Sequence, residues 1–288
     1  MRIGVNTMVW TGAFNTSHLP LLSKIRNWGF DSVEIAIFDY TEFPVRETRR
    51  ALQDLGLELS CTSVLPAGLS LLDASAAVRA EAMDWMRRAL TTVSELGGSA
   101  VVGPLYSPVG FLPGTRRTRD EWNRVVDCYR QLAPEFEKLP AKVAIEPLNR
   151  FETFFLNLAG DAVRLCDEIG SPSVGVLFDT FHANIEEQDP LAALRGTGRH
   201  LLHVHTCEND RGIPGSGHIP FPGVFETLKS LNYGGLCVIE SFASTIPELA
   251  RASAIWRDLA ASPDDLAVKG LEYLRRVDEG TKAASGVA

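Results

Sequence analysis

Residues 99–103 read SAVVG, and residues 236–240 read LCVIE. Both runs are apolar at successive positions, which is typical of a strand with two buried faces in a parallel sheet covered by helices. Outward from these two runs, short β-rich segments alternate with longer helical patterns along the chain. Strands that alternate with helices predict a parallel sheet, so we expect an α/β fold.

Eight β-rich runs are predicted as strands: Arg2–Asn6, Ser32–Ala36, Leu57–Ser63, Ser99–Gly103, Lys142–Glu146, Val174–Asp179, Leu201–His205 and Leu236–Glu240. Helical periodicity lies between them, in Ser17–Trp28, Arg46–Leu55, Ser75–Leu96, Thr118–Leu139, Gly160–Ile169 and Pro222–Leu231. Ser17, Ser75 and Thr118 are candidate N-caps of these helices. Eight β/α units favour a closed (β/α)8 TIM barrel over an open doubly wound sheet, and such a barrel usually has about 250 residues.

The 288-residue chain has the composition of a soluble globular protein, with 45% hydrophobic and 22% charged residues. The composition does not shift sharply along the chain, so we expect a single domain over residues 1–288, with Gly280–Ala288 as a flexible tail. The sequence contains neither a GxGxxG motif after the first strand nor a Walker A motif. Dinucleotides and nucleoside triphosphates are therefore not expected ligands.

The chain carries 28 Lys and Arg residues against 36 Asp and Glu residues, a net charge of −8. This balance lacks the basic surface that binding to a phosphate backbone requires, so nucleic acid is not an expected partner. The sequence has no apolar run of about 18 residues and no basic leader, so we expect neither membrane insertion nor export. The five cysteines are scattered and form no CxxC pair, which favours a reducing cytoplasm over a disulfide framework.

Four residues of metal-ligand type end the last four predicted strands: Glu146, Asp179, His205 and Glu240. They are about 30 residues apart, which corresponds to one β/α unit each. Parallel strands place their C-terminal ends on the face where TIM-barrel active sites lie, so we expect the four side chains to converge. Three carboxylates and an imidazole suit one divalent cation, with Mn²⁺ preferred and Mg²⁺ or Co²⁺ as alternatives. Any one of them alone could equally be a polar residue paired with a neighbour.

Further polar residues lie in predicted loops on the same face. Glu152, His182 and Arg211 are candidates for substrate contacts, although Glu152 and Arg211 could equally form a surface ion pair. Arg211 is followed by GIPGSGH (212–218), a glycine-rich loop. Such loops cradle phosphate in some barrels and form tight turns or lids in others.

Other residues near these strand ends receive structural interpretations. His203 points to the same side of its strand as His205 but one layer deeper, so we interpret it as a buried core histidine. Cys207 is interpreted as a spectator thiol, because no base is arranged for it. Four aromatic residues that follow predicted strands are candidates for the apolar walls of a small-ligand pocket: Trp10, Phe14, Tyr106 and Phe242.

Six segments carry a resemblance to a known family: VEIAIF (33–38), GPLYSPVG (103–110), AIEPLNRFETFFLN (144–157), LFDTFHANIEE (177–187), HVHTCENDRGIPGSGHIPF (203–221) and VIESF (238–242). They resemble the sugar isomerase and epimerase superfamily of xylose-isomerase-like barrels, most closely its D-tagatose, D-psicose (allulose) and L-ribulose 3-epimerases. The resemblance covers nearly the whole chain and implies a homo-oligomer, either a dimer or a tetramer. It implies metal ligands at Glu146, Asp179, His205 and Glu240, and substrate contacts at Glu152, His182 and Arg211.

The activity that this resemblance implies is that of a metal-dependent ketose 3-epimerase acting on a free ketose. A divalent cation bound to O2 and O3 of a ketose polarises the C2 carbonyl, acidifies C3–H and stabilises a cis-enediolate. Glu146 and Glu240, which approach from different sides of the barrel mouth, would then form the acid/base pair that inverts C3.

The same site would also suit an aldose–ketose isomerase, a polyol dehydratase or an epimerase of a phosphorylated ketose. For a phosphorylated substrate, Arg211 and the glycine-rich loop are the candidate anchors. A non-catalytic metal-binding or scaffold role is a further alternative. The abasic-site endonuclease branch of the barrel superfamily is disfavoured by the net charge of −8 and by too few clustered histidines.

Overall fold

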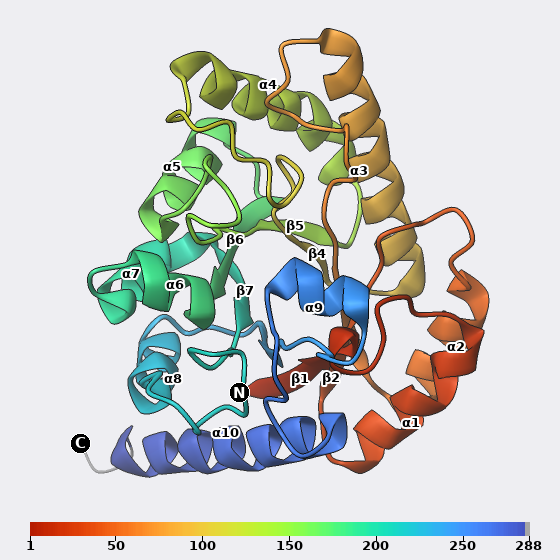
Figure 1. Ribbon diagram of the computed structural model, residues 1–288, viewed down its shortest axis with the longest axis vertical. Coiled ribbons are helices and arrows are strands. Elements are labelled where there is room, and N and C mark those ends of the chain that lie inside the picture. Colours follow the sequence, from red (N-terminus) through yellow and green to blue (C-terminus); the bar gives the residue numbers. More distant parts are fainter. Residues whose placement is uncertain (286–288) are drawn as a thin grey trace.

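The computed structural model describes residues 1–285, and within that range eight parallel strands pair in chain order and close into a barrel (Figure 1). Closure occurs where β8 pairs with β1, as in the register of Ile239 with Val5. The strands are β1 (Arg2–Asn6), β2 (Ser32–Ala36), β3 (Glu58–Thr62), β4 (Ala100–Gly103), β5 (Lys142–Ile145), β6 (Val174–Asp179), β7 (Leu201–His205) and β8 (Leu236–Ile239). The predicted (β/α)8 TIM barrel is therefore confirmed.

Helices surround the barrel as an outer layer, and short helices lie over its mouth (Figure 1). The α-helices are α1 (Leu19–Asn27), α2 (Val45–Leu55), α3 (Ala76–Leu96), α4 (Arg119–Phe136), α5 (Ala159–Ile169), α6 (Thr180–Glu186), α7 (Pro190–Thr197), α8 (Phe221–Ser230), α9 (Pro247–Ser253) and α10 (Pro263–Ser285). The 3-10 helices are η1 (Thr7–Val9), η2 (Thr16–His18) and η3 (Gly198–His200). None of the helices within residues 1–285 has both the length and the apolar character needed to cross a membrane.

The core lies between the barrel and its helices. Every residue of β2 and β6 is buried, which explains why most of their positions are apolar, although β2 also buries Glu34 and β6 ends in the buried Asp179. Helices contribute one apolar stripe each, for example Leu22 and Ile25 of α1, both fully buried. Each such side chain contributes about 1.5–3 kcal/mol when it leaves water, so the outer layer holds the strand ends in fixed positions.

Four strands are shorter than predicted: β3 lacks Leu57 and Ser63, β4 lacks Ser99, and β5 and β8 each lack their last predicted residue. β5 ends at Ile145 and β8 at Ile239, so Glu146 and Glu240 follow their strands instead of ending them. The N–H of Glu146 still donates to the carbonyl of Gly103 at 3.0 Å, and the next residue, Pro147, has no N–H to continue the ladder. Both glutamates therefore remain at the C-terminal face.

The C-terminal tail also differs from its prediction. A flexible segment was expected from Gly280, but α10 continues to Ser285. Thr281 is buried and accepts a hydrogen bond from Lys229 of α8, so contact with α8 stabilises this part of the helix. Residues 286–288 of the expected tail lie outside the described residues.

Of the three candidate N-caps, one forms a capping hydrogen bond, one occupies the N-cap position without such a bond, and one is not a cap. Ser17 is not a cap, because η2 covers residues 16–18 and His18 occupies the N-cap position of α1. Thr118 forms a capping box on α4: its hydroxyl accepts from the N–H of Glu121, and the Glu121 carboxylate accepts from the N–H of Thr118. Ser75 is at the N-cap of α3, but its side chain makes no capping hydrogen bond within residues 1–285.

Because Thr118 makes a capping hydrogen bond and Ser75 does not, we expect the loss of the Thr118 hydroxyl to destabilise the protein more than the loss of the Ser75 hydroxyl. Thr118→Ala should lower the free energy of unfolding by about 1 kcal/mol, because the N–H of Glu121 loses its acceptor and the Glu121 carboxylate loses the Thr118 hydroxyl. Ser75→Ala is the matched control and should change it by less than about 0.5 kcal/mol. Chemical denaturation of both variants measures the difference. Equal losses would show that the capping box does not stabilise α4.

Candidate active site

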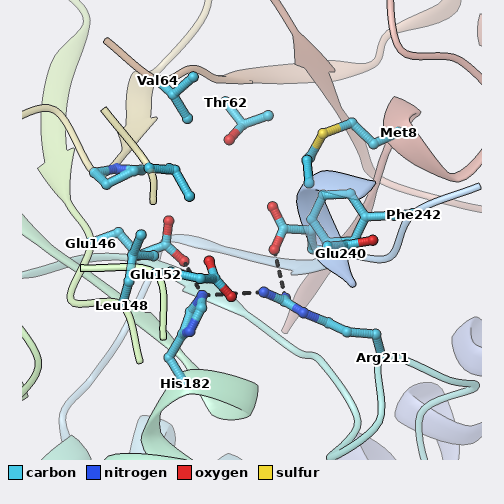
Figure 2. Close-up of a pocket in the computed structure, with 14 residues that line it drawn as sticks. Met8, Thr62, Val64, Glu146, Leu148, Glu152, His182, Arg211, Glu240 and Phe242 are labelled. Atoms are coloured by element: carbon cyan, nitrogen blue, oxygen red, sulfur yellow. Dashed lines mark hydrogen bonds and ion pairs between the residues drawn. The ribbon is translucent and has the colours of Figure 1, made fainter. Parts of the chain in front are cut away.

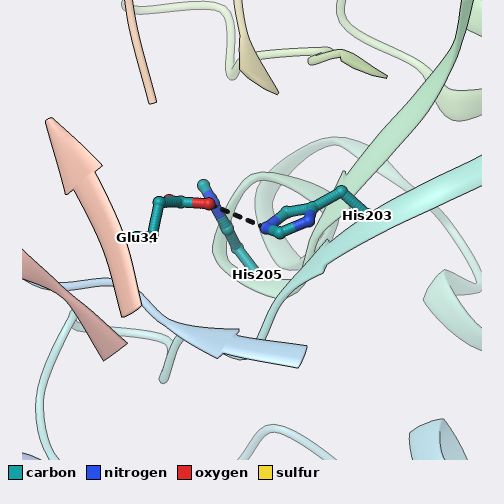
Figure 3. A group of neighbouring side chains, drawn as sticks. All are labelled: Glu34, His203 and His205. Atoms are coloured by element: carbon teal, nitrogen blue, oxygen red, sulfur yellow. Dashed lines mark hydrogen bonds and ion pairs between the residues drawn. The ribbon is translucent and has the colours of Figure 1, made fainter. Parts of the chain in front are cut away.

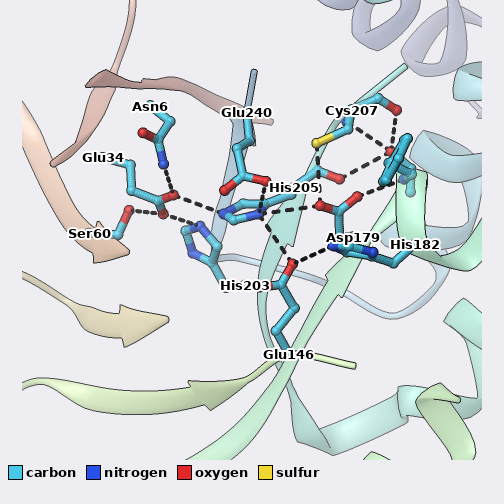
Figure 4. Close-up of polar contacts among 12 residues, drawn as sticks. Asn6, Glu34, Ser60, Glu146, Asp179, His182, His203, His205, Cys207 and Glu240 are labelled. Carbon is cyan, nitrogen blue, oxygen red and sulfur yellow. Dashed lines mark hydrogen bonds and ion pairs between the residues drawn. The ribbon is translucent and has the colours of Figure 1, made fainter. Parts of the chain in front are cut away.

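The four residues of metal-ligand type converge at the C-terminal face of the barrel (Figure 4). Their ligand atoms, Oε1 of Glu146, Oδ2 of Asp179, Nδ1 of His205 and Oε2 of Glu240, all lie within 4.8 Å of one another. Nδ1 of His205 is 3.4 Å from Glu240, 3.6 Å from Asp179 and 3.8 Å from Glu146. All four side chains are buried. The geometry thus brings together the whole set that strand-end spacing predicted.

Two of these atoms lack ordinary partners. Among the described residues, Oε1 of Glu146 and Nδ1 of His205 are buried and make no hydrogen bond. A buried polar atom without a partner costs about 1–3 kcal/mol, and these two face the same point as two further carboxylate oxygens. Three acidic groups and an imidazole nitrogen around one point are the donors that a hard or borderline divalent cation accepts. The residues therefore fit a single divalent cation.

The charges in this cluster perturb one another. Burial raises the pKa of Glu146 well above its usual value, and the neighbouring Glu240 raises it further. Burial also opposes ionisation of Asp179, but Arg211 and His182 outweigh it and hold the pKa of Asp179 below its usual value. The cluster therefore contains one carboxylate that is readily protonated beside one that stays ionised, an arrangement characteristic of functional sites.

Arg211 connects the cluster to its surroundings. Its Nη1 donates to Asp179 at 2.9 Å and to Glu240 at 2.7 Å. The guanidinium lies over the ring of Phe181, at 4.1 Å from the centroid. The backbone of Arg211 is left-handed, with φ 64°, a strain of about 1–3 kcal/mol that persists only where the surroundings hold it. Here Ser241 donates to the Arg211 carbonyl at 2.6 Å.

His182 and Glu152 stand beside Arg211 (Figure 2). Nδ1 of His182 accepts from the N–H of Asn149 at 3.0 Å, which leaves the ring proton on Nε2. Nε2 lies 3.1 Å from Nη2 of Arg211, so N–H donors of both side chains converge on one region. Burial lowers the pKa of His182 to about 3, so the ring is neutral. Burial raises the pKa of Glu152, whose Oε1 accepts from the side-chain amide of Asn149 at 2.7 Å.

A pocket of about 150 Å³ joins these groups. Its polar lining is formed by Glu146, Glu152, His182, Arg211 and Glu240, and its apolar lining includes Met8, Val64, Val109, Leu148 and Phe242. Ala252 and Ser253 at the end of α9 also line it, and Figure 1 shows α9 over the barrel mouth. The three predicted substrate contacts and the two carboxylates predicted as an acid/base pair, Glu146 and Glu240, therefore face a common cavity.

Of the four aromatic residues predicted as pocket walls, Phe242 lines the pocket and the other three do not. Trp10 stacks on Trp28, with ring centroids 5.9 Å apart. Phe14 stacks on Phe43, and Tyr106 packs against Phe155 inside the core. These three rings find apolar partners in neighbouring segments, which sequence position alone did not indicate.

The glycine-rich loop after β7 does not form a phosphate cradle. The N–H of Gly215 donates to the buried carboxylate of Glu208 at 2.8 Å, as does the N–H of Ile219 directly after the loop at 3.0 Å. The N–H groups of Gly212 and His218 donate to the side chains of Asp210 and Asn209. The acceptors of these amides are therefore part of the chain itself. This arrangement removes one of the two anchors proposed for a phosphorylated ketose.

Cys207 lies in contact with the site. Its thiol donates to Asp179 at 3.4 Å, and Nη1 of Arg211 lies 2.9 Å from its sulfur. Burial raises the pKa of Cys207 well above its usual value, so the thiol stays protonated. The interpretation of Cys207 as an unreactive thiol agrees with this environment.

Sequence analysis missed Glu34 of β2, which lies beside His203 and His205. His203 itself is buried, as predicted. The available signal for Glu34 was a charged residue within the otherwise apolar segment VEIAIF (33–38). Such a residue on a buried strand requires a partner inside the barrel.

Comparison with known proteins identifies a family with the same barrel fold and several similar epimerases. Residues 22–277 match the profile of the xylose isomerase-like TIM barrel family. The chain is 33% identical, over 276 residues covering 96% of both chains, to a probable ketose 3-epimerase from Synechocystis sp.. It resembles an L-ribulose 3-epimerase structure with a TM-score of 0.94, 29% identity, and coverage of 99% of this chain and 97% of that chain.

A further similar structure contains a bound sugar. It is a D-allulose 3-epimerase from Methylomonas sp. in complex with D-allulose, with a TM-score of 0.90, 29% identity and coverage of 96% of both chains. The relatives named here are isomerase-class enzymes.

Proposed function

The chain belongs to the xylose isomerase-like TIM barrel family and is an isomerase-class enzyme, and from this premise we propose that it is a metal-dependent ketose 3-epimerase acting on a free ketose. The observation that carries the proposal is the convergence of four buried ligand atoms at one wall of a pocket that is also lined by Glu152, His182 and Arg211. The complex of a similar D-allulose 3-epimerase with D-allulose supports a ketose as the substrate class.

In the proposed enzyme, Glu146, Asp179, His205 and Glu240 hold one divalent cation, with Mn²⁺ as first choice and Mg²⁺ or Co²⁺ as alternatives. When bound, the cation would polarise the C2 carbonyl of the ketose and stabilise the negative charge that develops on proton loss. Carboxylate and imidazole donors without sulfur favour such a cation over a structural zinc ion.

Glu146 and Glu240 are proposed to move the C3 proton. Figure 2 shows the two carboxylates on different sides of the pocket, so each can reach one face of a substrate bound between them. One carboxylate removes the proton from C3, giving an enediolate, and the other returns a proton to the opposite face, which inverts C3.

Glu152, His182 and Arg211 are proposed to bind the substrate hydroxyls. The neutral His182 ring and the Arg211 guanidinium both direct N–H donors to one region, where an oxygen of the sugar can accept them. Arg211 also fixes Asp179 and Glu240, so this residue acts on both substrate and ligands.

Glu152 provides the cleanest test of the substrate role, because its hydrogen bond to Asn149 lies away from the four proposed ligands. Glu152→Gln should lower kcat/KM by about tenfold to a hundredfold while the Mn²⁺ affinity stays within about twofold of wild type. Glu279→Gln, an exposed change on α10, is the control and should alter neither quantity. Calorimetric Mn²⁺ titration beside steady-state kinetics separates the two quantities. Loss of Mn²⁺ binding in Glu152→Gln would contradict the assignment.

The activity itself is tested by incubating the Mn²⁺-loaded protein with free and phosphorylated ketoses in D₂O and identifying each product by NMR. We expect the C3 epimer of a free ketose. An aldose product would instead identify an aldose–ketose isomerase, and an unsaturated or dehydrated product a polyol dehydratase. Exclusive turnover of phosphorylated ketoses would refute the preference for a free sugar.

We also propose that the protein is a homo-oligomer. Large apolar side chains near the barrel mouth are exposed, with Phe151 at 71% and Phe111 at 50% of their accessible area. Exposed aromatic residues of this kind are enriched at protein interfaces. Light scattering coupled to size exclusion should give a mass of two or four chains, and a monomer mass would contradict the proposal.

A further inference from the structure

Glu34 joins two histidines inside the barrel (Figure 3). The residue lies on β2 and is completely buried, as is His205, and His203 is nearly so. Oε1 of Glu34 lies 2.8 Å from Nε2 of His205, and Oε2 lies 2.8 Å from Nε2 of His203. The carboxylate thus contacts the ring nitrogen of His205 that faces away from the proposed metal site.

Glu34 is itself held in place by two further donors (Figure 4). The side-chain amide of Asn6 donates to Oε1 at 2.8 Å, and the hydroxyl of Ser60 donates to Oε2 at 2.8 Å. The amide orientation of Asn6 is fixed in turn, because its oxygen accepts from the N–H of Met8 at 2.8 Å.

The consequence for His205 is a defined tautomer. Oε1 of Glu34 already accepts from the Asn6 amide and Oε2 accepts from the Ser60 hydroxyl, so the carboxylate acts as an acceptor and Nε2 of His205 carries the proton that it donates to Oε1. Nδ1 is then the nitrogen that presents a lone pair, and it is the atom that faces Glu146, Asp179 and Glu240. The same contact fixes the orientation of the ring, because the carboxylate cannot follow a rotated imidazole while Asn6 and Ser60 hold it.

We propose that Glu34 is a positioning residue for metal binding, which holds the His205 ring with Nδ1 directed at the cation. This inference rests on the proposed metal site of the preceding subsection. Carboxylates that accept from the second ring nitrogen of a ligating histidine orient the ring and raise its basicity, and their loss weakens metal affinity about tenfold to a hundredfold.

Glu34, His203 and His205 could instead be three ligands of a second cation. The contacts do not favour this alternative. Nε2 of His205 is hydrogen-bonded to Oε1, and each carboxylate oxygen already accepts from Asn6 or Ser60. Nε2 of His203 lies 2.8 Å from Oε2 but makes no hydrogen bond among the described residues. The number of Mn²⁺ ions bound per chain distinguishes the two arrangements.

The test measures Mn²⁺ affinity and stoichiometry by calorimetry in the full chain. Glu34→Gln keeps the shape but places an amide where the carboxylate accepts from Asn6, Ser60 and His205, so its Kd for Mn²⁺ should rise about tenfold to a hundredfold. His203→Gln is the matched control, because it also breaks a buried contact of Glu34 but leaves the His205 contact in place. Its Kd should stay within about threefold of wild type. The melting temperature without added metal reports the loss of stability separately in both variants.

If Glu34→Gln does not fold, a less disruptive pair of variants tests the same positioning role. Ser60→Ala removes one donor from Glu34 and should raise the Kd about threefold to tenfold. Ser32→Ala removes a hydroxyl from the neighbouring barrel interior that makes no hydrogen bond within the described residues, and it should leave the Kd unchanged. Equal effects of the two serine changes would overturn the positioning role.

The remaining outcomes separate this inference from the proposed function. An unchanged Kd in Glu34→Gln, or equal weakening in His203→Gln, would overturn the positioning role while the metal site stands. Two Mn²⁺ ions per wild-type chain, with one lost in His203→Gln, would replace it with a second metal site. A wild-type protein that binds no divalent cation would refute the proposed metal dependence, and the role of Glu34 would fall with it.

Discussion

Replacing His205 with alanine is expected to reduce Mn²⁺ affinity by more than about a hundredfold and to abolish epimerisation at micromolar metal. The reason lies in the donor set. His205 supplies the nitrogen around which the oxygens of Glu146, Asp179 and Glu240 are arranged at 3.4–3.8 Å. Without it, three acidic groups remain in a buried space with no fourth protein ligand opposite them.

Calorimetric titration and metal analysis of the purified variant measure this loss. His200→Ala, which removes an imidazole bound to Asp167 outside the site, is the control and should bind Mn²⁺ like wild type. In parallel, chelation of the wild-type protein should remove its activity, and Mn²⁺ should restore it. Full turnover after chelation, or unchanged Mn²⁺ binding by His205→Ala, would show that the four residues are not the metal ligands.

The barrel and its four-residue cluster could be predicted because both follow from local pattern and topology. Apolar runs such as SAVVG (99–103) indicated strands with two buried faces, and parallel strands necessarily bring their C-terminal ends together. Asp179 and His205 end their strands as expected. Glu146 and Glu240 lie one residue further on, which does not change the face they share.

Contacts across the barrel interior could not be predicted in the same way. Glu34 and His205 are far apart in the sequence, and their pairing depends on which side chains of β2 and β7 point inward at the same height. The HVH pattern at 203–205 and the charged residue in VEIAIF (33–38) were the two signals, but neither identified the other as its partner.

Loop structure was the least predictable part of the site. Glycines in GIPGSGH (212–218) left a phosphate cradle, a tight turn and a lid as alternatives. In the structure, amides of that loop donate to side chains only a few residues earlier in the chain, such as Glu208 and Asn209. The position of α9 over the pocket was likewise absent from the predicted elements, because its seven residues are too few for a clear helical period.

Glu146→Gln and Glu240→Gln are each expected to lower the rate of epimerisation by about a hundredfold to ten-thousandfold, the usual contribution of a general acid or base. Gln keeps the shape of each side chain and an oxygen donor but cannot take a proton from C3. Because both residues are also proposed ligands, the rates must be compared at saturating Mn²⁺. Asp179→Asn is the matched control: it weakens a ligand that is not a proposed base, so saturating Mn²⁺ should restore more of its activity.

Isotope exchange tests the two-carboxylate scheme directly. With the wild-type protein in D₂O, the product should carry deuterium at C3 in both reaction directions, because the donating carboxylate differs from the abstracting one and equilibrates with solvent. In each Gln variant, the remaining carboxylate should still exchange C3–H of the epimer whose proton faces it, without inversion. The two variants should therefore wash out hydrogen from opposite epimers. Product that fully retains its original C3 hydrogen would refute the scheme and indicate a single base shielded from solvent or a hydride shift.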